Sequence, residues 1–394
     1  MSLENVSIVP LKDVVKRVKV GFVGSCNNDY CSSDEGVPMI RTTNLTTEGI
    51  KLENLKYINN TFHIAHKKSQ LHFGDILIAR HGHNGLASLW EYKFDAQCLN
   101  VVVVEPDESL ANRYYLTYLI NSPLIQKQIK SLTGGSVQSV VNTKDIADLL
   151  IPIPSLDKQK EIADFISLFN KKISVCKSIN KNLEEQLSLI FNDWFVKCTP
   201  YNGEQLIKTE WGYVPKSWKD IEFGELIEIT SGDRPDEKSE DKTSEFNIPL
   251  FGASKIMGYT KEASYNEDIL IIGRVGTHGV VQRVNYPCFP SDNTFVIKSD
   301  YYGFVYQLLK RIDYDSLNTG STQPLITQKS LKTVNAVLPD ENILFKFEMF
   351  SKTVFNEIQL NNHEIFNLTK LRDTLLPKLM SGEIDVSKIN CDLE

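Results

Sequence analysis

The sequence has few cysteines, no long apolar run and no excess of basic residues. Its seven cysteines are scattered over 394 residues, which favours a reducing cytoplasm over a disulfide framework. No apolar run approaches about 18 residues, so we expect no membrane-spanning helix, and the start MSLENVSIVPLKD lacks the pattern of a signal peptide. The net charge of −7 disfavours a lone nucleic-acid binder, because phosphate contacts need a basic surface.

Catalytic and metal-binding motifs are also missing. There is no G-x-x-x-x-G-K-[ST] for a nucleotide-driven motor, and GRVGTHG fails the dinucleotide pattern. The Asn- or Asp-Pro-Pro-aromatic tetrad of amino-methyltransferases does not occur. Cys26 and Cys31 with His63 and His66 lie outside the usual zinc spacings. The charged run PDEKSEDK crowds carboxylates and lysines into one loop, where a nuclease needs them on neighbouring strands. The sequence therefore predicts no catalytic residues and no metal site.

One short pattern occurs twice. RHGHNG (80–85) and RVGTHG (274–279) share Arg-x-Gly-x-x-Gly, and each contains histidine. Both follow an apolar run opened by aspartate, DILIA and DILII, and both precede another apolar run, LASLW and VVQRV. We expect a strand, a glycine turn and a second strand in each copy.

The duplication extends toward the carboxyl side. TGGSVQSVVNTKDIADLLIPIP (133–154) aligns with NTGSTQPLITQKSLKTVNAVLP (318–339) at a constant offset of 185 residues, which places Lys144 on Lys329. VPMIR (37–41) resembles IPLFG (248–252) at a larger offset. The offset between the two copies therefore decreases along the chain, from VPMIR to the segment 133–154. Such a decrease indicates a duplicated unit whose second copy has shorter loops.

A long helical pattern follows each copy. Seam residues alternate four and three apart, as in a coiled coil: Ile162, Ile166, Phe169, Ile173, Cys176, Asn180, Leu183, Leu187, Ile190 and Trp194. At an offset of 185 a weaker seam runs from Phe347 to Leu379, interrupted by Ser351 and Arg372. If the copies relate by a two-fold axis, the helices pair antiparallel. Asn180 then lies opposite Asn361 and fixes the register, unless each asparagine is solvated at a seam edge.

These patterns divide the chain into four segments. Residues 1–156 form a first domain, 157–198 a central spacer helix, 199–340 a second domain, and 341–394 a distal spacer helix with the carboxyl-terminal tail. The predicted fold is α+β, with two α/β domains separated by a pair of long antiparallel helices in a pseudo-two-fold internal repeat.

This repeat order, with IPIPSLDKQKEIADFI after the first domain and LLPKLMSGEI near the end, resembles the specificity subunit of type I DNA restriction–modification systems. The resemblance implies that each domain is a target-recognition domain for one half of a split DNA sequence. It also implies that the helices set the gap and dock two methyltransferase subunits, and that motor-nuclease subunits join for restriction. S-adenosylmethionine, ATP and Mg would then be held by the partner subunits, and the chain itself would bind double-stranded DNA without catalysis.

Three sets of polar loop residues are candidates for DNA contact, because Arg, Asn, Gln and His reach base edges while small hydroxyls and backbone amides suit phosphates. The first set is Arg80, His81, His83, Asn84, Arg274, Thr277 and His278. The second is Thr133, Gly134, Gly135, Ser136, Gln138, Thr319, Gly320, Ser321 and Gln323. The third is Arg41, Thr43, Asn44 and Lys255. Each set has a plain alternative, a surface turn without a ligand.

A different class of function also fits the sequence. A cytoplasmic coiled-coil adaptor would bind other proteins through the same loops, and the acidic balance favours it. The duplicated Arg, His, Asn and Gln loops favour the DNA reader.

Overall fold

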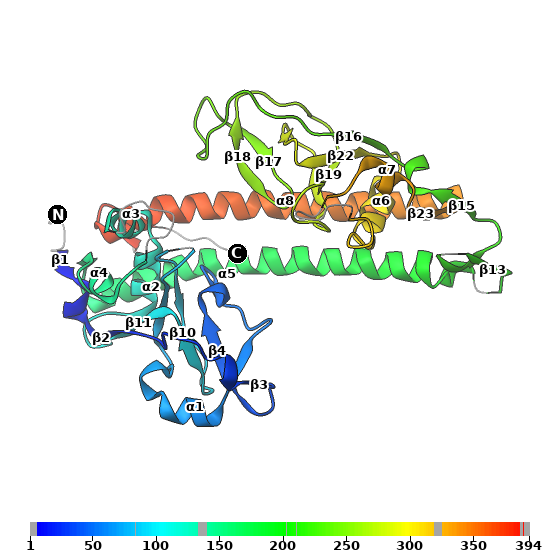
Figure 1. Ribbon diagram of the computed structural model, residues 1–394. Coiled ribbons are helices and arrows are strands. Elements are labelled where there is room, and N and C mark those ends of the chain that lie inside the picture. The colour runs from blue at the N-terminus through cyan, green and yellow to red at the C-terminus, as the bar shows by residue number, and fades with distance from the viewer. Residues whose placement is uncertain are drawn as a thin grey trace. The chain divides into compact units, whose positions relative to one another are not determined.

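A computed structural model of the chain describes residues 6–82, 84–132, 140–201, 203–209, 211–318, 325–386 and 389 (Figure 1). The chain divides into two compact units. Unit 1 comprises Met1–Ser178 with Asn361–Glu394, and unit 2 comprises Ile179–Leu360. These boundaries cut both long helices, whereas the division made from the sequence keeps each helix whole.

Unit 1 is built around a four-stranded antiparallel sheet. Its order is β2 (Val15–Val20), β11 (Val101–Pro106), β8 (Ile76–Ala79) and β9 (Ala87–Leu89). The central strand β8 is buried on both faces, so its apolar residues do not alternate with polar ones. Ile76 and Ile78 enter one core with Tyr115 of a covering helix, while Leu77 and Ala79 enter a second core with Trp90.

The other strands of unit 1 form smaller sheets. One has the order β10 (Gln97–Leu99), β4 (Gly36–Arg41), β7 (Lys56–Asn59) and β3 (Tyr30–Cys31), with β10 and β4 parallel. Two pairs are β1 (Ser7–Pro10) with β12 (Leu150–Ile153) and β5 (Leu45–Thr46) with β6 (Gly49–Ile50). The short helices are α1 (Asn60–Ala65), α2 (Arg113–Asn121), α3 (Pro123–Leu132) and α4 (Thr143–Ala147).

Unit 2 repeats this plan. Its antiparallel sheet has the order β16 (Glu228–Ser231), β22 (Thr294–Lys298), β19 (Ile269–Gly273) and β20 (Gln282–Val284). A second sheet orders β18 (Ile256–Thr260), β17 (Ile248–Phe251) and β21 (Phe289–Pro290). Two further pairs are β15 (Lys219–Glu222) with β23 (Asn335–Leu338) and β13 (Leu206–Thr209) with β14 (Gly212–Pro215). The short helices are α6 (Tyr302–Leu309) and α7 (Gln328–Lys332).

The two units share the four strands of their main sheet and one parallel pair. β2, β11, β8 and β9 take the places of β16, β22, β19 and β20, and the parallel pairing of β4 with β10 recurs between β17 and β21. The sequence match between VPMIR and IPLFG therefore corresponds to equivalent strands, β4 and β17. The internal repeat predicted from the sequence is confirmed.

Two long helices run through both units. α5 spans Leu156–Phe191 and continues as one π-helical turn over Asn192–Val196, and α8 spans Glu341–Met380. In unit 1, Ile162 and Ile166 of early α5 share a core with Leu376 and Leu379 of late α8. In unit 2, the end of α5 shares a core with the beginning of α8. The helices are therefore antiparallel, as predicted. Within the described residues, neither these nor any other helix is long and apolar enough to cross a membrane.

Polar residues in the predicted seams have partners inside each unit. Arg372 Nη1 donates a 2.8 Å hydrogen bond to Asn170 Oδ1, and Ser351, which is 1% exposed, donates to the Glu348 carbonyl. Asn180 belongs to unit 2 and Asn361 to unit 1, so their pairing stays a prediction. Toward the end of α5, Leu187 is buried at its predicted seam position. Phe191 and, in the π-helical turn, Phe195 are also buried, each one position beyond the expected Ile190 and Trp194, which pack against the same core but are only partly buried.

A half-buried carboxylate, that of Glu348, joins α8 to the start of α6 in unit 2. Glu348 accepts hydrogen bonds from the backbone N–H groups of Gly303 at 2.9 Å and Phe304 at 2.8 Å. Gly303 is required there, because a Cβ atom on it would lie 2.1 Å from Ser351 Oγ. Burial raises the pKa of Glu348 above its ordinary value, although the two N–H donors oppose the shift.

This shift gives stability a predictable pH dependence. Because the folded protein holds the Glu348 proton more tightly than the unfolded chain, the contribution of this group is most favourable below its ordinary pKa of 4.5 and is lost as pH rises through the raised pKa. We expect the stability of the wild type relative to Glu348→Gln to fall over that interval in urea unfolding. Glu357→Gln, at an exposed position of α8, should follow the wild type. Parallel curves for wild type and Glu348→Gln would contradict the assignment.

Candidate functional site

The two Arg-x-Gly-x-x-Gly segments form equivalent hairpin turns. Residues 80–85 join β8 to β9, and residues 274–279 join β19 to β20, so the predicted strand, turn and strand are confirmed in both copies. All four glycines have positive φ: Gly82 76°, Gly85 87°, Gly276 84° and Gly279 78°. Side-chain-bearing residues rarely adopt this conformation, which explains why glycine occupies all four positions.

Different neighbours support the two turns. In unit 1, Gln126 Nε2 of α3 donates to the Gly85 carbonyl at 2.9 Å, and Ile129 packs so close that a Cβ on Gly85 would meet its side chain at 2.9 Å. In unit 2, the ring of Tyr314 lies 3.7 Å from the corresponding Cβ position of Gly279. A Cβ atom on Gly85 would therefore clash with α3, whereas a Cβ atom on Gly279 would be in ordinary van der Waals contact with Tyr314.

The arginine that opens each turn braces a distant segment of its unit. Val141 N–H donates to the Arg80 carbonyl at 3.2 Å, and Arg80 Nε donates back to the Val141 carbonyl at 3.1 Å. In unit 2, Ile326 N–H donates to the Arg274 carbonyl at 2.9 Å. Val141 and Ile326 are themselves equivalent at the offset of 185 residues, so both copies make the same backbone contact. The sequence repeat already aligns Val141 with Ile326, but only the structure shows that these two residues bond the arginines of the turns.

The predicted polar residues of the turns differ in their availability. His81 and Thr277 are exposed, and Asn84 is half-buried. His278 is turned inward: its Nδ1 lies 3.1 Å from the Gly273 carbonyl, and its ring stacks on Tyr314 with centroids 6.4 Å apart. The half-buried His278 ring thus helps to hold the second turn, and its contact with a base stays a prediction.

The third set flanks equivalent strand ends. Arg41 ends β4, and Thr43 is exposed in the turn that follows. Asn44 is only 3% exposed; its Oδ1 accepts from Arg41 N–H and its Nδ2 donates to the Lys51 carbonyl. Asn44 therefore shapes this loop, and its contact with DNA stays a prediction. Lys255 is exposed in the turn between β17 and β18.

Several candidates lie outside the described residues. They are His83, together with the whole second set: Thr133, Gly134, Gly135, Ser136, Gln138, Thr319, Gly320, Ser321 and Gln323.

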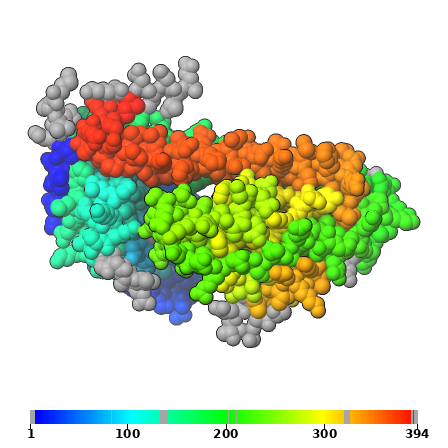
Figure 2. All heavy atoms as spheres, turned by 90° about the horizontal axis from the view of Figure 1, so that it is seen from above, coloured from blue at the N-terminus to red at the C-terminus, as the bar shows by residue number. Residues whose placement is uncertain are grey.

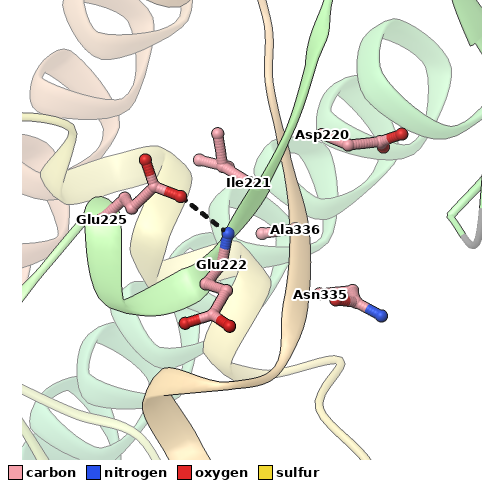
Figure 3. Close-up of a pocket in the computed structure, with 6 residues that line it drawn as sticks. All are labelled: Asp220, Ile221, Glu222, Glu225, Asn335 and Ala336. Carbon is pink, nitrogen blue, oxygen red and sulfur yellow. Dashed lines mark hydrogen bonds between the residues drawn. The ribbon is translucent and has the colours of Figure 1, made fainter.

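A hollow of about 340 Å³ in unit 2 has the wrong charge for DNA. Figure 3 shows its lining: Asp220, Ile221, Glu222, Glu225, Asn335 and Ala336. One Glu225 carboxylate oxygen accepts from Glu222 N–H at 3.0 Å and so serves the local turn. The remaining carboxylates would repel phosphate. Across the described ranges, no group of three or more His, Cys, Asp or Glu side chains is placed to hold a metal ion.

The structure defines a class of protein: two equivalent α+β units share a pair of long antiparallel helices, and each carries a glycine turn on its central sheet. The family model for the type I restriction modification DNA specificity domain matches residues 4–185 and 215–365. The chain belongs to this family, that of the specificity subunits of type I DNA restriction–modification systems.

Individual relatives agree in length and fold. The chain is 26% identical over 304 residues to the type I restriction enzyme MjaIX specificity subunit of Methanocaldococcus jannaschii, covering 70% of each chain. It is 23% identical over 364 residues to the MjaVIII specificity subunit of the same organism, covering 83% of each. The S subunit of a type I system from M. genitalium has the same fold, with a TM-score of 0.53 at 15% identity, over 95% of this chain and 96% of that one.

Proposed function

We propose that this chain is the DNA-reading subunit of a type I restriction–modification complex, in which each unit reads one half of a bipartite target. The observation that carries the proposal is the recurrence of the same sheet and the same glycine turn in two units of one chain. A reader needs polar groups on short loops held by a rigid base, and these turns supply them.

The paired helices set the gap between the half-sites in this proposal. Recognition modules must be held at a separation that matches the DNA helix, about 34–36 Å per turn. The 36-residue α5 would span roughly 54 Å at 1.5 Å per residue, enough to keep two readers about one turn or more apart. The antiparallel arrangement suits a pseudo-two-fold protein on a split DNA target.

The same helices would dock two methyltransferase subunits. Large apolar side chains are exposed along α8, which lies at the surface in Figure 2: Phe345, Met349, Leu360, Phe366 and Leu371. On α5, Leu168, Val175, Ile179 and Leu189 are likewise exposed. Apolar residues repeated along a helix suit protein partners. Such partners would also supply the positive surface that a chain of net charge −7 lacks.

The chain contributes no catalytic step in this scheme. The methyltransferase subunits would bind S-adenosylmethionine and modify adenine, and motor-nuclease subunits with ATP and Mg would carry out restriction. The specificity subunit would direct all of them to one sequence.

Mapping methylated adenines tests the proposal directly. DNA from cells that carry the chain and its partners should be methylated at a split motif with a constant gap. Replacing residues 1–156 by the corresponding domain of another family member should change one half of that motif and leave the other half and the gap unchanged. Methylation without a split motif, or a change in both halves, would contradict reading by two independent units.

The adaptor hypothesis rests on the acidic composition and makes a different prediction. With its methyltransferase partner, a DNA reader should show sequence-selective binding that weakens steeply as salt rises, because each phosphate contact releases counterions. An adaptor should show no preference for any duplex under the same conditions.

A further inference from the structure

We infer that Lys144 and Lys329 are equivalent phosphate-contacting residues, one in each unit, which hold the DNA backbone beside the glycine turns. The inference rests on the proposed DNA-reading function. In this inference the two lysines bind the sugar–phosphate backbone of DNA. They are therefore distinct from the residues that read bases.

The two lysines occupy the same position in duplicated structure. Lys144 is the second residue of α4 and Lys329 the second residue of α7. Each helix begins with a contact from the N-cap backbone to the side chain three residues on: Asn142 N–H donates to Asp145 in unit 1, and Thr327 N–H donates to Ser330 in unit 2. The local backbone that presents the lysine is therefore built in the same way in both units.

The brace described above brings each lysine close to its turn. Lys144 comes three residues after Val141, which is bonded to Arg80, and Lys329 comes three residues after Ile326, which is bonded to Arg274. Three residues span at most about 11 Å. The DNA major groove is about 12 Å wide, so a group at this distance from a loop in the groove can reach the flanking phosphates.

Neither lysine is neutralised within its unit. Both are exposed, and in the part of the chain that the structure describes neither ammonium has an ion pair within 4 Å. The acids around α4 have other partners: Asp148 pairs with Lys12 at 2.8 Å and feels the Lys144 charge less strongly than that of Lys12, and Asp145 accepts from Asn142 N–H at 3.1 Å. α7 itself contains no acidic residue. Both charges are therefore available to an anion, in a protein whose overall balance is acidic.

Salt titration of DNA binding tests the inference. The probe is a labelled duplex that carries the mapped motif, and the protein is the full chain with its methyltransferase subunits. Each phosphate contact contributes about 0.9 to the slope of log K against log salt. Lys144→Ala and Lys329→Ala should each reduce the slope by about that amount, and the double variant by about 1.8. The methylated motif should not change, because phosphate contacts carry no base information.

Matched controls come from the same units. Lys67 follows α1, which Figure 1 places at the other end of unit 1 from α4, and Lys208 lies in β13 of unit 2; both are exposed. Lys67→Ala and Lys208→Ala should keep the wild-type slope, and Lys144→Arg with Lys329→Arg should keep it as well because the charge is retained. Unchanged slopes for the alanine variants, or an altered motif, would overturn the inference. Failure of the wild-type complex to select any duplex would instead overturn the proposed function.

Discussion

Replacing Phe191 by alanine should lower the free energy of unfolding of unit 2 by about 3–5 kcal/mol, the usual range for a buried phenylalanine. Phe191 is 0% exposed, and its ring lies 5.1 Å from Phe195, 5.5 Å from Phe304 and 5.7 Å from Phe347, measured between centroids. The Arg311 guanidinium lies 4.3 Å above the same ring. Truncation would remove contacts among α5, α6 and α8 at once and leave a cavity.

Tryptophan fluorescence during urea unfolding should measure this loss. Trp194, Trp211 and Trp218 belong to unit 2, so the signal is dominated by that unit. Leu189→Ala is the control on the same helix: its side chain is 67% exposed, and its effect should stay within about 0.5 kcal/mol. Equal losses for Phe191→Ala and Leu189→Ala would show that the aromatic cluster does not hold unit 2 together.

Replacing Gly85 by alanine should destabilise the first glycine turn by about 2–4 kcal/mol. About 1 kcal/mol comes from positive φ, and the rest from overpacking, since the new Cβ would meet Ile129 at 2.9 Å. Because Gly85 N–H also donates to the Ala79 carbonyl at the end of β8, relief of the clash must move the turn. We expect faster amide exchange in β8 and β9, with relaxed specificity in one half of the motif only.

Gly82 provides the matched comparison in the same turn. Its φ is also positive, at 76°, but among the described residues beyond its chain neighbours no atom lies within 4 Å of the Cβ position, so Gly82→Ala should cost about 1 kcal/mol from strain alone. Truncating the clashing side chain in Gly85→Ala/Ile129→Ala should give a smaller loss than the sum of the two single variants. A strictly additive double variant, or equal costs at Gly82 and Gly85, would refute the steric explanation.

Local patterns predicted much of the fold correctly. The hairpins at 80–85 and 274–279 follow from apolar runs around paired glycines, because strand periodicity and positive φ are properties of a few neighbouring residues. The antiparallel helices follow from two apolar seams and the symmetry of the repeat. At the end of α5 and in the π-helical turn that follows, Phe191 and Phe195 are buried one position beyond the predicted Ile190 and Trp194, because α6 as well as α8 covers the helix there.

Tertiary contacts, and not the sequence pattern, distinguish the predicted site residues that are exposed from those whose side chains are used within the fold. Asn44 and His278 have the chemistry of base readers, but hydrogen bonds within their own loops bury Asn44 and keep the His278 ring half-buried. Arg80 serves in part as a brace for Val141, which lies 61 residues further along the chain. No spacing pattern in the sequence predicts a contact between residues this far apart in the chain.

By itself the sequence determined the duplication, the positions of the turns and the presence of two long helices, because each depends on residues that are neighbours in the chain. Only the tertiary structure decided which polar side chains are exposed and which are used internally, and that the arginine of each turn bonds the segment before α4 or α7. Burial and hydrogen bonding depend on residues far apart in sequence, whose approach is set by the packing of the whole unit.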